Sequence, residues 1–546
     1  MLSSRLRMPP RTHSADVVIA GGGLAGLVTA LSLLDRGKSV LVVDKDSRER
    51  LGGLARESFG GVHFIGTPHQ RRMGIRDTPD LAYEDWERCA RFGPDDDWPR
   101  RWARHYCDHS LDAFRFLVDR KVAFLPLVNW PERGAAVPGN RVPRWHIAWG
   151  TGFEIVRRVV DALEAHPRRA ALTLLCDHEV NAIAVEGGRP RAFTGKEMAG
   201  GAEFAARGEQ LVVASGGICG GDLSRVRSHW RGDLGPPPRV LLNGAHRYGD
   251  GLLHDRVAGI GGRLTHLDLH WHYAAGIHHP ARRRPDDGLS LVPPRSALWM
   301  NAHGARIGPT PLCGYTDTGF LVEQILKQPG QYSWQVMNWK IAIKELAVSG
   351  CDYMTAFRHK RRLLLLRHLL LGNAELVRRL IAECPDDVVA ADSLPELVRA
   401  MNQRGLDGHL VDGARLEADV RAYDDEIARG EAYFTDEQLR RIMGFRQSRG
   451  DRLRVCRYQP ILDPGARPLI AIREFILSRK SLGGIQTDLD CRVLDEAGRP
   501  IPGLNAVGEA AGFGGGGIHG RGALEGTFLG GCVITGLRAG RSIAEA

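Results

Sequence analysis

The segment between residues 16 and 44 constrains the fold of this chain more than any other. It contains, in order, a short run of buried β-formers (16–20), a turn with the sequence GGGLAG (21–26), a helical period (27–36) and a second buried strand (39–43) that ends at Asp44. Strand, glycine turn, helix, strand and acid in this order are typical of a dinucleotide-binding βαβ unit. The sequence therefore predicts an α/β protein whose parallel sheet binds a nucleotide close to residue 21.

The glycines of the turn and the acid after the second strand have separate physical roles in such a unit. Gly21 permits the tight turn, Gly23 lets the backbone approach a pyrophosphate, and Gly26 lets the helix pack closely on the strand. The N–H groups at the helix N-terminus attract the phosphates. Asp44 is placed to accept a hydrogen bond from a ribose hydroxyl. The motif alone leaves open whether the nucleotide is NAD or FAD.

The pattern of strands and glycine turns is interrupted once along the chain. It runs from residue 15 to about 290, gives way to charged helices and tryptophans, and returns after about residue 450. We expect a Rossmann-like nucleotide-binding domain (15–290 and 450–546), made of a parallel sheet and a β-meander, that is interrupted by an α+β substrate or capping domain (291–449). Residues 1–14 lack an apolar signal region and are expected to be a disordered leader.

Charge and cysteine usage exclude several classes of function. The formal net charge is +10, but the 74 basic and 64 acidic residues are interspersed and no recognition motif accompanies them, so we expect no nucleic-acid partner. The ten cysteines form no CxxC pair and no zinc-site spacing, which predicts reduced thiols, no metal and a cytoplasmic setting. No apolar run is long enough to span a bilayer.

One tract rich in leucine and arginine, residues 358–371, has two interpretations. It could be an amphipathic helix that lies on a membrane surface. It could instead be a docking helix of the capping domain, whose arginine stems cover apolar surface. The second interpretation is favoured here, because the apolar run is short and is broken by Arg367 and His368.

Several segments resemble the flavoprotein superfamily of fumarate reductase and succinate dehydrogenase, and within it the branch similar to 3-ketosteroid 1-dehydrogenases. The resemblance extends from the first strand to the last helix, and the segments that define it are WGTG (149–152), RKSLGG (479–484), PGLNAVGE (502–509), GFGGGG (512–517) and ALEGTFLGGC (523–532). It implies the fold described above and FAD as the cofactor. It is much less specific for the substrate.

The same resemblance implies a set of FAD-binding residues. The first glycine turn and Asp44 would hold the ADP half, a second glycine loop and Ser58 would approach the flavin, and Glu509 would bond the ribitol or pyrophosphate region. Backbone N–H groups after Gly526 would face the flavin, where a helix N-terminus stabilises negative charge. The full set is Gly21, Gly23, Leu24, Ala25, Gly26, Asp44, Lys45, Gly52, Gly53, Ser58, Val180, Ala214, Ser215, Gly216, Asp250, Gly508, Glu509, Gly526, Thr527 and Phe528.

Four residues are candidates for catalysis, and the chain departs from the family around three of them. Arg306 matches the proton-carrying arginine of fumarate reductases, although Ile307 replaces the expected Phe, and the alternative is an ion pair at the domain interface. His519 resembles the His-Gly beside the flavin, and Arg521 is the nearest arginine to Ala523, where fumarate reductases bind substrate with an Arg. No tyrosine follows residue 458, so the tyrosine of ketosteroid dehydrogenases is missing from the C-terminal glycine segment.

Tyr273 is the fourth candidate, as a general acid or base. It ends the run His270-Trp271-His272-Tyr273. Because side chains alternate along a strand, His270 and His272 share one face and Trp271 and Tyr273 share the other.

Three functions follow from these residues. The first is an FAD-dependent dehydrogenase that introduces a C=C bond next to a carbonyl in a hydrophobic, ketosteroid-like substrate. The second is a fumarate-reductase-like reductase of unsaturated carboxylates or enones. The third is a flavin-binding protein without catalysis. The chain has no second nucleotide fingerprint, so we expect an electron acceptor other than NAD. The sequence does not determine the oligomeric state.

Overall fold

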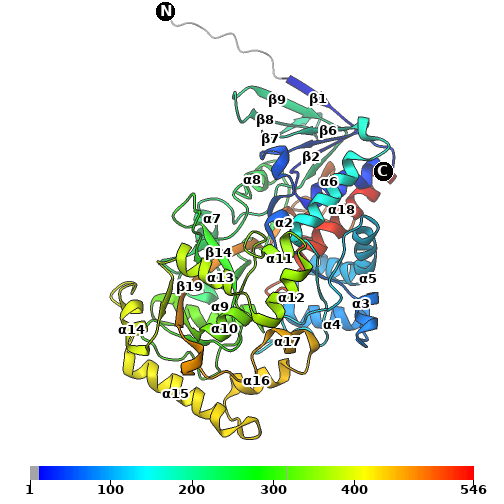
Figure 1. Cartoon of the computed structure of the whole chain (residues 1–546). Helices are drawn as coiled ribbons and strands as arrows, with labels where there is room; N and C mark the ends of the chain where they lie inside the picture. The colour runs from blue at the N-terminus through cyan, green and yellow to red at the C-terminus, as the bar shows by residue number, and fades with distance from the viewer. Residues whose placement is uncertain (1–10, 315) are drawn as a thin grey trace, which may run out of the picture.

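A parallel sheet forms the centre of one of two lobes (Figure 1). The computed structural model describes residues 11–314 and 316–546. The strand order is β21 (Arg492–Leu494), β22 (Pro500–Ala506), β10 (Gln210–Val213), β2 (Val17–Ala20), β3 (Val40–Val43) and β6 (Leu172–Leu175), and only β21 runs antiparallel to its neighbour. The strands β2 and β3 are buried at every position, as expected for strands covered on both faces. The predicted βαβ unit is confirmed.

Two helices pack against each other beside this sheet. They are α1 (Leu24–Leu34), which follows the first glycine turn, and α18 (Thr527–Glu545), the last helix of the chain. Glycines on α18 permit the close approach, because a Cβ atom at Gly540 would lie 2.4 Å from Cβ of Ser32 and one at Gly536 would lie 2.8 Å from the carbonyl oxygen of Ala25. The two helices run in the same direction, since Gly536 meets Ala25 and Gly540 meets Ser32. Because Ala25 is near the start of α1 and Gly536 is in the middle of α18, the N-terminal half of α18 extends beyond the N-terminus of α1.

A small antiparallel sheet covers the outer end of this lobe. The strands β7 (His178–Glu186), β8 (Arg189–Glu197) and β9 (Glu203–Arg207) form the predicted meander, and β1 (Arg11–Ser14) pairs in parallel with β9. Residues 11–14 of the predicted disordered leader are therefore a strand, because the free edge of β9 offers backbone partners that a sequence pattern does not reveal. The rest of that leader lies outside the described residues.

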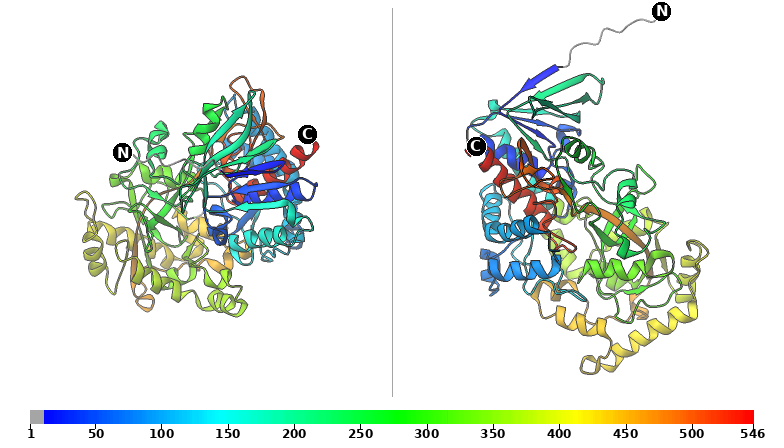
Figure 2. Two further views of the ribbon diagram at one scale, coloured as in Figure 1. Left: turned by 90° about the horizontal axis from the view of Figure 1, so that it is seen from above. Right: turned by 180° about the vertical axis from the view of Figure 1, so that it is seen from behind.

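The segment between β3 and β6 adds helices around α1 and α18: α5 (Asp97–Asp119) packs against α18, as the view from behind in Figure 2 shows, and α6 (Thr151–Glu164) packs against α1. The segment also contains α2 (Gly53–Glu57), α3 (Pro68–Arg72) and α4 (Pro79–Ala90), together with the strand pair β4 (Gly61–His63) and β5 (Trp145–Ile147). The indole rings of Trp86 and Trp102 are buried here and donate to backbone carbonyls of the C-terminal segment.

The second lobe is built on an eight-stranded sheet. Its main path is β15 (Leu298–Met300), β16 (Tyr332–Asn338), β19 (Leu469–Ser481), β13 (His270–His278), β14 (Gly288–Val292) and β17 (Ala347–Val348), and both β11 (Leu242–Asn243) and β18 (Val388–Ala391) also pair with β19. Helices surround it: α9 (Thr318–Leu326), α10 (Trp339–Glu345), α11 (Thr355–Arg358), α12 (Arg362–Leu371), α13 (Ala374–Glu383), α14 (Leu394–Asn402), α15 (Gly413–Arg429), α16 (Glu437–Phe445) and α17 (Arg449–Arg454). Short elements join the lobes: α7 (Ser224–Ser228), α8 (Leu252–Gly259), β12 (Leu264–Thr265) and β20 (Gly484–Ile485).

The predicted limits of the capping domain, 291–449, divide this sheet. The strand β13 and most of β14 precede residue 291, and β19, the central strand, follows residue 449. The sheet of the second lobe therefore takes strands from both sides of the predicted limits, and the division of the chain into domains stays a prediction. A buried strand has the same apolar pattern in either lobe, so composition alone cannot assign it to one of two sheets.

A buried ion-pair cluster joins α4 and the segment just before it to the start of β5. The guanidinium of Arg144 donates to Asp77 at 2.9 Å and to Asp85 at 2.6 Å, and none of the three side chains is accessible to solvent. We expect Arg144→Met to destabilise the fold by about 3–5 kcal/mol, because the buried carboxylate of Asp77 would lose its cation. The carboxylate of Asp85 would keep only its pairs with Arg88 and Arg141. The measurement is the urea midpoint of unfolding followed by tryptophan fluorescence.

The matched control is Arg499→Met, which removes an exposed pair with Asp495. It should cost less than about 1 kcal/mol. Equal shifts of the midpoint in the two variants would contradict the structural role of the Arg144 cluster.

Candidate functional site

Two connected cavities lie where the lobes meet. The nucleotide channel follows the ends of β2, β3 and β10 and the start of α1, and the junction cavity lies between the start of α18 and the strands β13 and β19. The two share four lining residues: Leu54, Ala55, Glu509 and Cys532. A long ligand can therefore extend from one cavity into the other. In open α/β sheets, ligands bind at the carboxyl ends of the strands, which is where the channel runs.

Three glycines expose bare backbone to the channel. A Cβ atom at Gly23 would find no protein atom nearer than 3.9 Å, and the corresponding distances are 3.5 Å at Gly53 and 3.7 Å at Gly216. All three residues line the channel, so a side chain at any of them would project into the space that a ligand needs. The N-terminus of α1 begins at Gly23 and has no side-chain cap. Its free N–H groups form an anion site suited to a pyrophosphate.

Gly21 and Gly26 have the packing roles expected of them. Gly21 has a φ of +118°, and a Cβ there would lie 2.2 Å from the carbonyl oxygen of Ala214. A Cβ at Gly26 would lie 2.1 Å from the carbonyl oxygen of Gly21. Gly26 therefore shapes the turn without lining the channel.

The acid at the end of β3 lies at the far end of the channel. The carboxylate of Asp44 accepts the N–H of Gly22 and, at 2.7 Å, the N–H of Asp46. Burial raises its pKa above the usual value of an aspartate. Lys45 forms an ion pair with Glu179 on β7. Both Asp44 and Lys45 line the channel.

Most of the predicted cofactor-binding residues converge on the two cavities. The nucleotide channel is lined by Gly21, Gly23, Leu24, Ala25, Asp44, Lys45, Gly52, Gly53, Val180, Ala214, Ser215, Gly216, Asp250 and Glu509. The junction cavity is lined by Ser58, Gly526 and Phe528, and again by Glu509. Gly508 and Thr527 line neither cavity but directly adjoin residues that do. Sequence reasoning missed four residues that line the channel outside any motif: Arg50, His178 at the start of β7, His246 and Tyr248.

Glu509 stands where the two cavities join. Its Oε1 accepts the backbone N–H of Ser481 at 2.9 Å, and burial raises its pKa to about 7. Gly508, which precedes it, has a φ of +63° and donates its N–H to the hydroxyl of Thr535 on α18. The positive φ of Gly508 allows the turn that directs the carboxyl of Glu509 toward the junction of the two cavities.

The N-terminus of α18 opens on the junction cavity. Gly526 caps it with a φ of +92° and no side chain serves as a cap, while Phe528 and Leu529 line the cavity. The first N–H groups of a helix have no partner within the helix. They and the helix dipole favour negative charge at this position.

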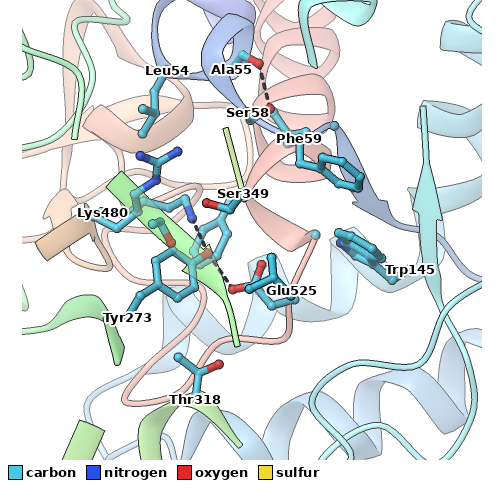
Figure 3. Close-up of a pocket in the computed structure, with 18 of the residues that line it drawn as sticks. Leu54, Ala55, Ser58, Phe59, Trp145, Tyr273, Thr318, Ser349, Lys480 and Glu525 are labelled. Atoms are coloured by element: carbon cyan, nitrogen blue, oxygen red, sulfur yellow. Dashed lines mark hydrogen bonds between the residues drawn. The ribbon is translucent and has the colours of Figure 1, made fainter. Parts of the chain in front are cut away.

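The walls of the junction cavity are mostly apolar (Figure 3). The apolar lining consists of Leu54, Ala55, Phe59, Trp145, Ala274, Ala275, Leu291, Val292, Pro293, Leu321, Phe513, Phe528 and Leu529. Such a surface suits a ligand with a large hydrophobic body, and the few polar groups would fix its orientation.

A cluster of three ionisable side chains interrupts this apolar surface. The hydroxyl of Tyr273 donates to Oε1 of Glu525 at 2.7 Å, and Nζ of Lys480 donates to the same hydroxyl at 3.1 Å. Burial lowers the pKa of Lys480 to about 8. The indole of Trp271 donates to Glu525 at 3.1 Å and fixes the carboxylate. Figure 3 shows the three groups meeting across the cavity from Phe59 and Trp145.

Of the four predicted catalytic residues, only Tyr273 lines the junction cavity. The predicted alternation along its strand is confirmed, since Trp271 and Tyr273 both reach Glu525 while His272 stacks on Trp230. Lys480 and Glu525 were not among the candidates. Both lie in segments that carry the family resemblance, but a lysine or a glutamate in a motif does not show by itself which way its side chain points.

His519 lies behind the cavity wall. Its ring is inaccessible to solvent, stacks on Trp86 with centroids 5.6 Å apart, and bonds the hydroxyl of Thr527 through Nε2 at 2.8 Å. Burial lowers its pKa to about 3. Phe528, whose ring lies 4.8 Å from that of His519, lines the cavity instead. The geometry gives His519 a positioning role at the start of α18 and does not support direct proton transfer.

The two arginine candidates lie outside the cavity. Arg306 donates to Asp436 at 2.6 Å and to Gln438 at 2.8 Å, so its geometry matches an ion pair rather than a proton carrier. The pair lies within the second lobe rather than between the lobes. Arg521 is more than half exposed and lies 3.7 Å from Asp233. Its side chain does not line the junction cavity that Glu525 enters.

Residues 11–314 and 316–546 contain neither a metal-binding cluster nor a membrane-spanning helix. In these ranges no group of three or more His, Cys, Asp or Glu side chains could hold a metal ion. No helix there has the length and apolar character needed to cross a membrane.

Comparisons with known proteins identify the family and the fold. The model of the family described as "FAD binding domain" matches residues 16–529. The chain is 41% identical to a KsdD-like steroid dehydrogenase of Mycobacterium tuberculosis, over 97% of this chain and 96% of the relative. The structure of 3-ketosteroid Δ1-dehydrogenase from Sterolibacterium denitrificans has a TM-score of 0.70 at 18% identity, over 97% of this chain and 99% of that one. A flavocytochrome c3 fumarate reductase has a TM-score of 0.67 at 19% identity, over 98% and 78%.

The bare backbone at Gly23 offers a direct test of the nucleotide channel. Gly23 has ordinary extended dihedrals (φ −70°, ψ 173°) and free space beside it, so Gly23→Val should fold. The valine would occupy the place of the pyrophosphate, and we expect the purified protein to lose its FAD. The measurement is the flavin absorbance per chain, with circular dichroism as the test of folding.

Gly259→Val is the matched control. Gly259 ends α8, has no atom within 4 Å of its virtual Cβ, and lines neither cavity. Full flavin content in both variants would contradict the assignment of the channel.

Proposed function

The chain belongs to the FAD-binding domain family, on its KsdD-like steroid dehydrogenase side, and we propose that it is an FAD-dependent dehydrogenase that forms a C=C bond next to the carbonyl of a ketosteroid-like substrate. FAD, its cofactor, fits the two cavities: glycine backbone and the start of α1 for the pyrophosphate, Asp44 for a ribose, and the start of α18 for the flavin end. When bound, FAD takes the hydride that leaves the β-carbon of the substrate.

The observation that carries the proposal is the bonded set Tyr273, Glu525 and Lys480 in an apolar cavity. Loss of a hydride from the β-carbon requires that the α-carbon loses a proton. The Tyr273 oxygen accepts this proton as its own proton moves along the 2.7 Å hydrogen bond to Glu525. The C–H electron pair of the α-carbon then becomes the second bond of the C=C.

Lys480 makes this transfer easier. Its ammonium group lies 3.1 Å from the Tyr273 oxygen and stabilises negative charge there while the proton passes. The surrounding apolar walls exclude water, and electrostatic interactions are stronger in such a site than in solvent. Trp271 keeps Glu525 in position throughout.

The apolar walls also support the substrate class. A rigid hydrocarbon skeleton would contact Phe59, Trp145 and Phe528, all of which line the cavity. A small unsaturated dicarboxylate would instead need several cationic groups. The residue predicted for that reaction, Arg306, is bound to Asp436 outside the cavity, so the geometry favours the dehydrogenase over the fumarate-reductase-like alternative.

The two electrons left on the cofactor must go to another acceptor. We infer that it is not NAD, because the described residues offer one dinucleotide fold, and the channel accounts for it. A cytoplasmic setting suits the ten cysteines, all of which are free thiols.

We expect Tyr273→Phe to lower the rate of flavin reduction by a 3-ketosteroid about 100- to 10,000-fold, the range typical of a lost general acid or base. FAD content should not change, because the hydroxyl does not line the nucleotide channel. The measurement is anaerobic stopped-flow bleaching of the flavin after mixing with substrate. Tyr433→Phe, at an exposed tyrosine, is the control. An unchanged rate in Tyr273→Phe would refute the role of Tyr273, and no bleaching of the wild type by any 3-ketosteroid would refute the substrate class.

The lowered pKa of Lys480 predicts the pH dependence of the same rate. The ammonium group is protonated below about pH 8 and is lost as pH rises through that value, so the rate should fall above about pH 8. In Lys480→Arg the fall should move to higher pH, since a guanidinium keeps its proton. In Lys480→Met the rate should be low at all pH values, with no step near pH 8. A step at the same pH in all three proteins would assign it to another group.

A further inference from the structure

Helix α12 exposes leucines to solvent on a scale unlike any other element described here. None of its residues is buried, and its exposed leucines are Leu363 (85%), Leu366 (53%), Leu369 (39%), Leu370 (74%) and Leu371 (69%). Leu363, Leu366 and Leu370 follow each other at spacings of three and four residues and so share one face. The tract does pack against α10 and α11, with Leu364 and Leu365 half-buried, but most of its leucines face solvent. Exposed apolar patches of this kind mark interaction sites.

The charged residues of segment 354–373 are all of one sign. Residues 354–373 include no Asp or Glu and five Arg or Lys. Two of the five are held by the protein, since Lys360 pairs with Glu154 and Arg358 stacks on Phe153. The other three, Arg361, Arg362 and Arg367, are exposed and make no ion pair with any residue in the described ranges.

The helix is tied to the rim of the junction cavity. Ser349 lines the cavity, and the next residue, Gly350, bridges to Ser58, which also lines it. Phe357 on α11 packs on Phe59 of the cavity wall, with ring centroids 5.1 Å apart. Only four residues separate Phe357 from the start of α12. In Figure 1, α11 and α12 lie together in front of the region where the lobes meet.

We propose that α12 docks on an anionic lipid surface, with its leucines in the boundary between headgroups and acyl chains and its free arginines on the phosphates. Exposed leucines and unpaired arginines on one helix match the two components of such a surface. A protein partner or a second copy would have to supply an apolar face and anionic groups together, and a bilayer supplies both. Docking there places the apolar junction cavity beside the lipid, from which a water-insoluble substrate can enter.

The test is co-sedimentation of the FAD-loaded protein with vesicles, without substrate. We expect binding to vesicles of equal parts phosphatidylglycerol and phosphatidylcholine, weaker binding at high salt because the charges are exposed, and little binding to pure phosphatidylcholine. Leu363→Glu with Leu370→Glu should lower the partition coefficient about tenfold or more. Arg361→Gln with Arg362→Gln and Arg367→Gln should abolish the preference for anionic lipid.

The matched control is Leu410→Glu with Leu453→Glu, at two exposed leucines elsewhere on the second lobe. It should bind vesicles as the wild type does. No binding of the wild type to anionic vesicles, or equal binding of control and α12 variants, would overturn the proposal. So would a dimer in sedimentation velocity that the α12 leucine variant abolishes without any change in lipid binding. None of these readouts depends on turnover, so failure of this proposal is distinguishable from failure of the proposed dehydrogenase activity.

Discussion

The close packing of α1 on α18 sets the geometry on which both cavities depend. Gly536 and Gly540 let the two helices approach until backbone and small side chains touch. Ala25, the second residue of α1, meets Gly536, the tenth residue of α18. The N-terminus of α18 therefore extends about 12 Å past that of α1 at the rise of an α-helix. Two helix N-termini thus face the two connected cavities, α1 the nucleotide channel and α18 the junction cavity. Larger residues at Gly536 or Gly540 would separate the two helices and so change where the N-terminus of α18 lies relative to both cavities.

The second lobe completes the site because the end of its strand β19 lies beside the place where the two cavities join. The strand is the centre of the cap sheet, and its last residues cross to the nucleotide lobe, where Lys480 reaches Tyr273 and the N–H of Ser481 holds Glu509. One strand therefore connects the substrate-facing cluster to the carboxyl that stands between the cavities. The third member of the cluster, Glu525, comes from the loop before α18. The bonded set of Tyr273, Glu525 and Lys480 is consequently assembled from both lobes and depends on how they meet.

Burial explains why ionisable groups in this region differ in their chemistry. Lys480, Glu509 and His519 all have pKa values shifted toward the neutral form, because the surrounding protein solvates charge less well than water does. For His519 the shift removes it from acid–base chemistry at neutral pH and leaves a neutral ring that bonds Thr527. For Lys480 it brings the titration into an accessible range. The glycine-rich run 512–517 permits this burial, because its backbone packs directly on Trp102 and His266.

The sequence by itself determined the nucleotide-binding unit. The glycine turn, the buried strands on either side and Asp44 are local features, and nearly all the cofactor residues predicted from them and from the family resemblance line the two cavities. The sequence also singled out Tyr273, which lines the junction cavity, and the side-chain alternation along its strand, which is a local property. The tertiary structure alone decided the partners of Tyr273, since Lys480 and Glu525 are separated from it by 207 and 252 residues. It also decided that Arg306 pairs with Asp436, that His519 lies behind Phe528 and that the leucines of α12 face solvent. Each of these depends on what packs against a side chain, and a motif specifies a residue type without specifying its neighbours.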